Sequence, residues 1–540
     1  MNMRIQILAI LTLFVLALSP PVKAQTLDEL KAEIQKMQRQ INRLEAQQKR
    51  TSGQVQRQAR TPPSRAPSSV QVEQAEQAAA QAQAAAQQAQ QNAQQIKEQA
   101  VAETLAQFKP PPGKPGGLTV RIPQVNTTVR LYGFIKLNGT TDLTTRDRTD
   151  ALSAQSIQLF GTGNKRQGGD TALSARRSRI GLETWTPIND TWGEFHTQFE
   201  MDLAGGTNPF GISASSPATN NAYVPRLRLA YADFGKSKGG WGNFLFGQQA
   251  STFNDQVLLP IQWMSDWDFV GLSNVRQAQF RYTYGFANGI SASAAVESPV
   301  SDVTTVAGTS FPDQNGGGGV GWQTTPDFAG RVLWRDPTIG LLALRGVVRP
   351  QIALNNNAAS AIAQRFNRST SGWGIGLTGV INLFDGKLVL MASGNAGQGL
   401  GRYLTNTASG FSAVSNFGLP GTMIGDDASI NAVGIYGGMV GAQYFFTPTL
   451  RTNMSIGGAR LNYPDYASLF CASAGNASTC SMTNTSMWAA AINLVWSPFS
   501  AVDLGVEYQH LERSLIAGGG VQAAAGGVEN RIQFTAIGRF

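Results

Sequence analysis

From residue 118 onward the sequence alternates apolar and polar residues with a period of two, and this pattern restricts the fold more than any other feature. In the segment 130–138, one face carries Leu131, Ile135 and Leu137. The other face carries Arg130, Tyr132, Lys136 and Asn138. Such alternation predicts a β-strand with one apolar and one polar face. The same pattern recurs at 179–183, 194–200, 226–231, 502–508 and 531–535.

Short turn signals separate these segments in pairs. They lie at 187–190, 235–240, 287–289, 336–338, 385–387, 447–449 and 498–500. Long segments rich in Ser, Thr, Asn and Gly lie between successive turns, and this asymmetry is typical of transmembrane β-barrels. The turns account for fourteen strands, and a first strand at Val129 and a last at Arg531 bring the prediction to about sixteen antiparallel strands. A barrel of that size encloses a water-filled channel, and its polar face lines the water because lipid cannot solvate it.

Residues 1–24 resemble a secretion signal. Arg4 precedes an apolar run from Ile7 to Leu18, and Val22-Lys23-Ala24 offers small residues for cleavage after Ala24. That run is too short to span a membrane, and no later segment reaches the roughly 20 continuous apolar residues of a spanning helix. With 14% charged residues and 59 glycines, the exported chain fits a barrel of the bacterial outer membrane.

The residues before the barrel predict a helical extension in the periplasm. Residues 25–50 carry a heptad seam of Leu27, Leu30, Ile34, Met37, Ile41 and Leu44, which predicts a coiled coil that needs partner chains. Residues 51–70 form a Pro-rich linker, residues 71–108 an Ala/Gln-rich helical heptad segment, and residues 109–117 a Pro/Gly linker. The predicted sixteen-stranded barrel then spans residues 118–540.

The sequence offers little for catalysis or metal binding. Cys471 and Cys480 are expected to form a disulfide in an oxidising compartment, because their spacing matches no zinc site. His196 alternates with Glu194, but a His/Glu metal site there is disfavoured, and His510 begins an outer loop. We expect no enzyme activity, no metal and no cofactor. The net charge of +9 does not indicate nucleic-acid binding in an exported barrel.

Arginine dominates the basic residues of the barrel. From residue 119 on, 24 of the 29 basic residues are Arg, which favours recognition of carboxylate or phosphate. A band near mid-height is predicted on the inner face from Arg179, Arg228, Arg281, Arg331 and Arg345. Above it lie Arg177, Arg226 and Arg349, and Arg130, Lys136 and Arg335 also face inward. The alternative is that these arginines only pair with inner carboxylates such as Glu183, Glu194, Glu200 and Glu507. A positive constriction would favour anions.

The segment 248–274 predicts the constriction itself. It contains eight large apolar residues between Val257 and Phe269, and a water-exposed loop of that content would leave much apolar area unburied. We expect it to fold back into the barrel, where Asp255, Asp266 and Asp268 would face the arginines.

Several motifs together resemble a known family. Leu131-Tyr-Gly133, Ser178 to Glu183 and Tyr231 to Gly235 resemble trimeric general porins, and the heptad N-terminus with 179–184 and 248–253 looks like the DcaP-like porins. The resemblance implies a homotrimer with a periplasmic coiled coil that takes up dicarboxylic acids, embedded in outer-membrane lipid and lipopolysaccharide. Phe540 resembles the terminal aromatic residue that the barrel assembly machinery reads. The Ala/Gln segment is longer than the family's pattern.

These features favour passive diffusion of small anions, with dicarboxylates as the leading hypothesis. Phosphate or another inorganic anion would suit an arginine band equally well. A third hypothesis is structural, with the extension tethering the outer membrane to the cell wall and the pore being secondary.

Overall fold

The computed structural model describes residues 118–144, 152, 157–159, 168–205, 223–255, 269–305, 310–311, 320–321, 323–355, 367–404, 412–416, 429–472, 480, 483–516 and 526–540. The predicted signal peptide, coiled coil, linkers and Ala/Gln segment lie outside these residues, as do Asp266 and Asp268. The hypotheses that rest on them remain predictions.

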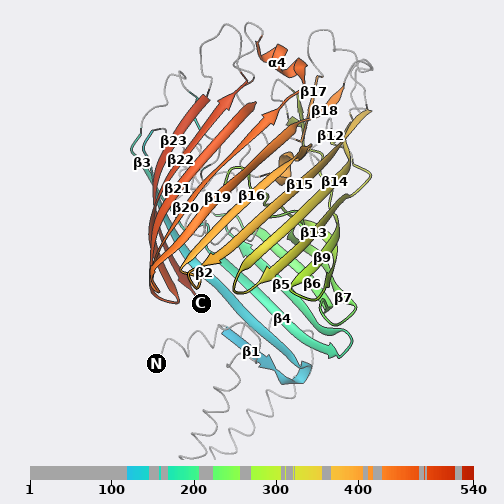
Figure 1. Ribbon diagram of the computed structural model, residues 1–540, viewed down its shortest axis with the longest axis vertical. Coiled ribbons are helices and arrows are strands. Elements are labelled where there is room, and N and C mark those ends of the chain that lie inside the picture. Colours follow the sequence, from blue (N-terminus) through green and yellow to red (C-terminus); the bar gives the residue numbers. More distant parts are fainter. Residues whose placement is uncertain are drawn as a thin grey trace, which may run out of the picture. The chain divides into compact units, whose positions relative to one another are not determined.

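The described chain forms a closed antiparallel barrel of sixteen strands (Figure 1). The strands are β2 (Thr127–Asp142), β4 (Arg179–Asn189), β5 (Gly193–Asp202), β6 (Arg226–Lys236), β7 (Gly242–Ala250), β8 (Arg276–Gly285), β9 (Ile290–Glu297), β13 (Asp327–Asp336), β14 (Gly340–Asn355), β15 (Asn367–Leu383), β16 (Leu388–Gln398), β19 (Gly434–Thr447), β20 (Leu450–Asn462), β21 (Asn484–Phe499), β22 (Val502–Leu515) and β23 (Gly526–Arg539). Pairing of β2 with β23, from Phe134↔Arg539 to Asp142↔Arg531, closes the barrel. The predicted barrel of sixteen antiparallel strands is confirmed.

The predicted short turns fall where the chain reverses at one end of the barrel. They join β4–β5, β6–β7, β8–β9, β13–β14, β15–β16, β19–β20 and β21–β22. At the opposite end, short elements belong to the longer connections: β3 (Asp170–Ser174), β12 (Val320–Gly321) and α4 (Asp465–Ala472). A separate small sheet contains β10 (Val303–Thr305), β11 (Ser310–Phe311), β17 (Ala413–Ser415) and β18 (Ile430–Ala432). β1 (Leu118–Ile122) pairs with the start of β2.

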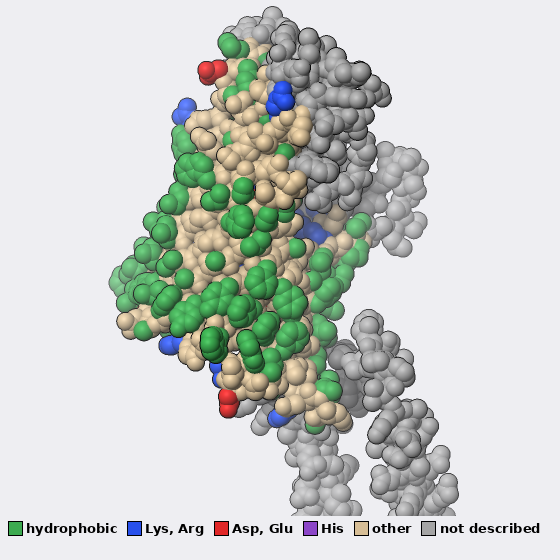
Figure 2. Space-filling view, turned by 90° about the vertical axis from the view of Figure 1, so that its right-hand side faces the viewer, with side chains coloured by type: hydrophobic (Ala, Val, Ile, Leu, Met, Phe, Trp, Pro, Cys, Tyr) green, Lys and Arg blue, Asp and Glu red, His purple; other side chains and the backbone are tan. Residues whose placement is uncertain are grey.

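The two faces of the wall differ in polarity as the alternation predicts. On β2, Ile135 and Leu137 are 63% and 42% exposed, while Lys136 and Asn138 are 3% and 1% exposed. Large apolar side chains cover much of the outer surface (Figure 2). In the ranges that the structure describes, no helix has the length and apolar character of a membrane crossing.

A disulfide holds the segment that follows β20. Cys471, in α4, bonds to Cys480, and both are buried with Ala467 against Tyr463 and Tyr466. Burial raises the pKa of the Tyr466 hydroxyl, which donates a hydrogen bond to the Val414 carbonyl at 2.8 Å. This segment is therefore tied both to itself and to the small sheet.

Replacing both cysteines with serine should loosen α4 without opening the barrel, since closure depends on β2 and β23. A disulfide that closes a loop of this size contributes about 2–3 kcal/mol in the chain-entropy description. Limited proteolysis should cut the Cys471→Ser/Cys480→Ser variant faster around residues 465–483. The heat-dependent gel mobility of the folded barrel should stay unchanged. Equal cleavage of variant and wild type would contradict this role for the disulfide.

Candidate functional site

The connection between β7 and β8 enters the barrel. Its described ends are residues 251–255 and 269–275, and in them Phe253, Phe269 and Val270 are completely buried. Gly271 lies against β19 and β20 on the far wall. A Cβ on Gly271 would lie 2.6 Å from both the Gly438 nitrogen and the Gly458 oxygen, and its φ of +83° also favours glycine. The chain therefore crosses the lumen here.

An ion pair anchors this crossing segment to the wall. Asp255 lies 2.5 Å from the Arg345 guanidinium, and both side chains are 1% exposed. Arg345 also donates to the Phe253 carbonyl at 2.5 Å and to the Thr378 hydroxyl at 2.9 Å. The Asn395 amide donates to Asp255 and to the Gly271 carbonyl, both at 3.0 Å. The charge of Arg345 is thus neutralised by the loop that it holds.

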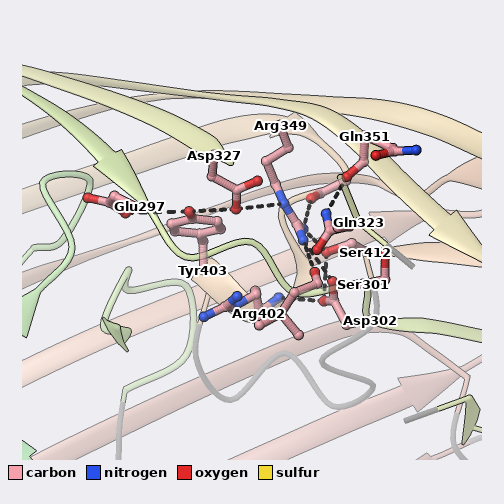
Figure 3. A network of polar contacts seen from close by, with 12 residues as sticks. Glu297, Ser301, Asp302, Gln323, Asp327, Arg349, Gln351, Arg402, Tyr403 and Ser412 are labelled. Carbon is pink, nitrogen blue, oxygen red and sulfur yellow. Dashed lines mark hydrogen bonds and ion pairs between the residues drawn. The ribbon is translucent and has the colours of Figure 1, made fainter. Parts of the chain in front are cut away.

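A second network surrounds Arg349 (Figure 3). Its side chain is fully buried and pairs with Asp302 at 3.0 Å and Asp327 at 3.3 Å. It also donates to the Gly399 carbonyl at 2.6 Å. Tyr403 donates to Asp327 at 2.9 Å; burial, reinforced by the charge of Asp327, raises the pKa of the Tyr403 hydroxyl and keeps it a donor. Because Asp302 and Gly399 come from two different outer connections, this network fastens both to the wall.

Most of the other predicted arginines on the inner face are also paired. The pairs are Arg130–Glu183 at 2.8 Å, Arg179–Glu200 at 3.2 Å, Arg226–Asp202 at 2.7 Å, and Arg228 with Glu200 at 3.0 Å and Asp202 at 2.7 Å. Lys136 is buried on β2, and Arg177 lies in the connection between β3 and β4. These paired arginines therefore fit the alternative interpretation, in which arginines on the inner face only form ion pairs with inner carboxylates.

Arg281 on β8 and Arg331 on β13 differ from these. Both are partly exposed, and within the described ranges neither makes an ion pair or a hydrogen bond. Arg331 lies directly across from Arg345 in the β13–β14 register. The carboxylate that acts electrostatically on both is Glu297, which accepts hydrogen bonds at 2.7 Å from Ser251 and Thr252. Neither guanidinium group is therefore neutralised at contact distance by a carboxylate of the described chain.

The histidines form no catalytic or metal arrangement in the described chain. His196 contacts Asp233 at 2.7 Å and stacks on Trp185, and His510 contacts Asn530 at 2.8 Å. No group of three or more His, Cys, Asp or Glu side chains suited to a metal ion occurs among the residues described.

Comparisons with known proteins support the fold. No protein-family model matches the sequence, and no curated protein matches it. Among solved structures, the outer membrane channel DcaP of Acinetobacter baumannii matches with a TM-score of 0.55 and 19% identity, over 78% of this chain and 99% of the other. This chain has the DcaP channel fold. The anion-selective porin of Comamonas acidovorans matches with a TM-score of 0.42 and 13% identity, over 77% of this chain and 100% of that one. The DcaP-like resemblance drawn from the sequence motifs thus agrees with the observed fold.

Sequence reasoning named Glu183, Glu200 and Asp255, which pair with inner arginines, but missed the partners of Arg349. Asp327 shares the parity of Arg331 on β13, so alternation could have placed it on the inner face. Asp302 and Tyr403 lie in long connections without periodicity, and no local signal indicates that they meet Arg349.

Replacing Asp255 with alanine should release the crossing segment. Removal of one partner of a buried ion pair costs about 3–5 kcal/mol, because Arg345 would be left charged and unpaired. Single-channel conductance in a planar bilayer should rise and become noisier. Asp190→Ala, in the exposed β4–β5 turn, is the matched control and should conduct as wild type. Unchanged conductance in Asp255→Ala would show that Asp255 does not hold the segment.

Proposed function

We propose that the protein is an outer-membrane porin through which small anions, chiefly dicarboxylates, diffuse passively. The observation that carries this proposal is the pair Arg281 and Arg331, whose charges no described carboxylate neutralises at contact distance. They lie in a lumen narrowed by the segment between β7 and β8. Cations at such a constriction attract anions and repel cations.

The positions of the two arginines favour a ligand with two anionic groups. In the strand register Arg281 pairs with Ala295, while Arg331 pairs with Ser293 on the same strand, β9. The two Cα atoms are therefore separated by two strand spacings and two residue rises, roughly 12 Å. Long side chains reach inward from both points, so a short dicarboxylate can contact both guanidinium groups. Each planar guanidinium can hold a carboxylate with two hydrogen bonds.

Arg345 and Arg349 do not belong to this anion site in our proposal. Their side chains are buried and their charges are balanced by Asp255, Asp302 and Asp327. We assign them the role of fixing the loops that shape the pore. Inorganic phosphate remains the second candidate solute, because one guanidinium is enough to bind it.

The outer surface supports a place in the membrane. The apolar outer wall suits contact with outer-membrane lipid and lipopolysaccharide, and we propose a homotrimer as the assembly. Phe540 is 41% exposed, and its backbone nitrogen donates to the Gly133 carbonyl at 3.1 Å. We propose that the barrel assembly machinery reads this terminal aromatic residue.

Removing both free charges should weaken anion selectivity. For Arg281→Ala/Arg331→Ala, reversal potentials under a salt gradient should move toward zero, because the lumen loses two cations that no described carboxylate contacts. Arg121→Ala, which removes an exposed cation from β1, serves as control and should keep the wild-type value. Cation selectivity of the wild type, or an unchanged potential in the double variant, would refute the anion proposal.

The conservative variant separates charge from geometry. Arg281→Lys/Arg331→Lys keeps both charges but lacks the planar fork, so anion selectivity should persist while block of the current by succinate weakens about tenfold or more. Block by phosphate should change less. If phosphate blocks the wild type and succinate does not, the inorganic-anion function is the correct one.

A further inference from the structure

The outer wall carries a hollow across β15, β16, β19 and β20. Exposed backbone at Gly394, Gly438 and Gly458 forms its floor. The apolar side chains Leu344, Ile375, Leu377 and Tyr436 flank it, and its volume is about 770 Å³. We refer to it as the outer hollow. It faces away from the lumen, because the flanking side chains are about half exposed on the apolar face of the wall.

Packing within the chain does not explain why a glycine stands at position 394. A Cβ added at Gly394 would meet no atom within 4 Å. The inner face of the same wall differs: a Cβ at Gly457 would meet the Val270 carbonyl at 2.8 Å, and one at Gly437 would meet Gly271 at 3.1 Å. Close approach of the crossing segment explains the glycines at 437 and 457. On the outside, the open space at Gly394 is available to a ligand.

A cation lines the same hollow. Arg460 on β20 shares the outer face with Met454 and Ile456, which are 48% and 51% exposed. It lies about ten residues beyond the β19–β20 turn, near the far edge of an apolar band about 25 Å tall. In the part of the chain that the structure describes, Arg460 makes no ion pair or hydrogen bond. A cation on a lipid-facing wall is costly unless an anion accompanies it.

We propose that the outer hollow is a binding site for a phosphorylated, acylated glycolipid of the outer leaflet, of the lipid A type. An acyl chain lies over Gly394 between Leu377 and Tyr436, and a phosphate pairs with Arg460. Apolar burial supplies the chain's affinity, and the guanidinium supplies a charge-assisted contact to phosphate. The proposal does not depend on which solute the pore conducts.

Native mass spectrometry of the detergent-purified full chain, incubated with lipid A, tests this site. Wild type should retain lipid A at a defined stoichiometry. Arg460→Gln should retain about tenfold less, because one charge-assisted contact is lost, and lipid A without phosphates should bind wild type equally weakly. Gly394→Leu fills the hollow without an internal clash and should abolish retention.

Gly346→Leu is the matched control. It adds the same side chain to a second outer hollow flanked by Phe280, Val296 and Phe328, where a Cβ would meet only the Gly374 oxygen at 3.8 Å. This variant should retain lipid A as wild type does. Heat-dependent gel mobility confirms that each variant is folded, and Arg460→Gln provides a test that adds no bulk. Wild-type retention by both Arg460→Gln and Gly394→Leu would overturn the proposal, as would loss of oligomers in Gly394→Leu with lipid retained.

Discussion

The requirement that every backbone N–H and C=O group in lipid has a partner determines the rest of this structure. A sheet meets it only when its first and last strands pair, and here β2 and β23 do so along nine residue pairs from Phe134↔Arg539 to Asp142↔Arg531. Closure fixes one face toward lipid and the other toward water. With a side-chain period of two, charged residues of the strands then favour the lumen face, and Arg460 on the outer face of β20 is an exception. The concentration of arginines inside is a consequence of closure as well as of function.

Cations on the inner face need either water or a carboxylate. Where a segment covers them, as at Arg345 and Arg349, water is excluded and a carboxylate is buried with them: Asp255 for the first, Asp302 and Asp327 for the second. Buried pairs of this kind are weak evidence for stability but strong determinants of position, because either partner left alone is costly. The two networks thus hold long connections inside the barrel that would otherwise extend from its end.

The sequence predicts the wall better than it predicts the lumen. Strand number, turn positions and the facing of Lys136 or Arg228 follow from local periodicity and turn residues, which need no knowledge of distant contacts. The partners of Arg349 do not follow. Asp302 and Tyr403 reach Arg349 from connections that are 47 and 54 positions away in sequence, and their spacing carries no period. Strand alternation alone therefore overestimates the number of inner-face arginines that can contact a solute.

The crossing segment contacts the same carboxylates that lie near the proposed anion site. Asp255 is drawn to Arg345, which leaves Arg331, its neighbour across β13 and β14, without that carboxylate. Ser251 and Thr252 of the same segment donate hydrogen bonds to Glu297, the acidic group that acts on both Arg281 and Arg331. These two donors, each 2.7 Å from a Glu297 carboxylate oxygen, hold the carboxylate where it acts electrostatically on Arg281 and Arg331 without forming an ion pair with either. The segment that narrows the pore therefore also contacts Asp255's partner Arg345 and the Glu297 carboxylate. In our proposal, constriction and anion preference arise from the same contacts.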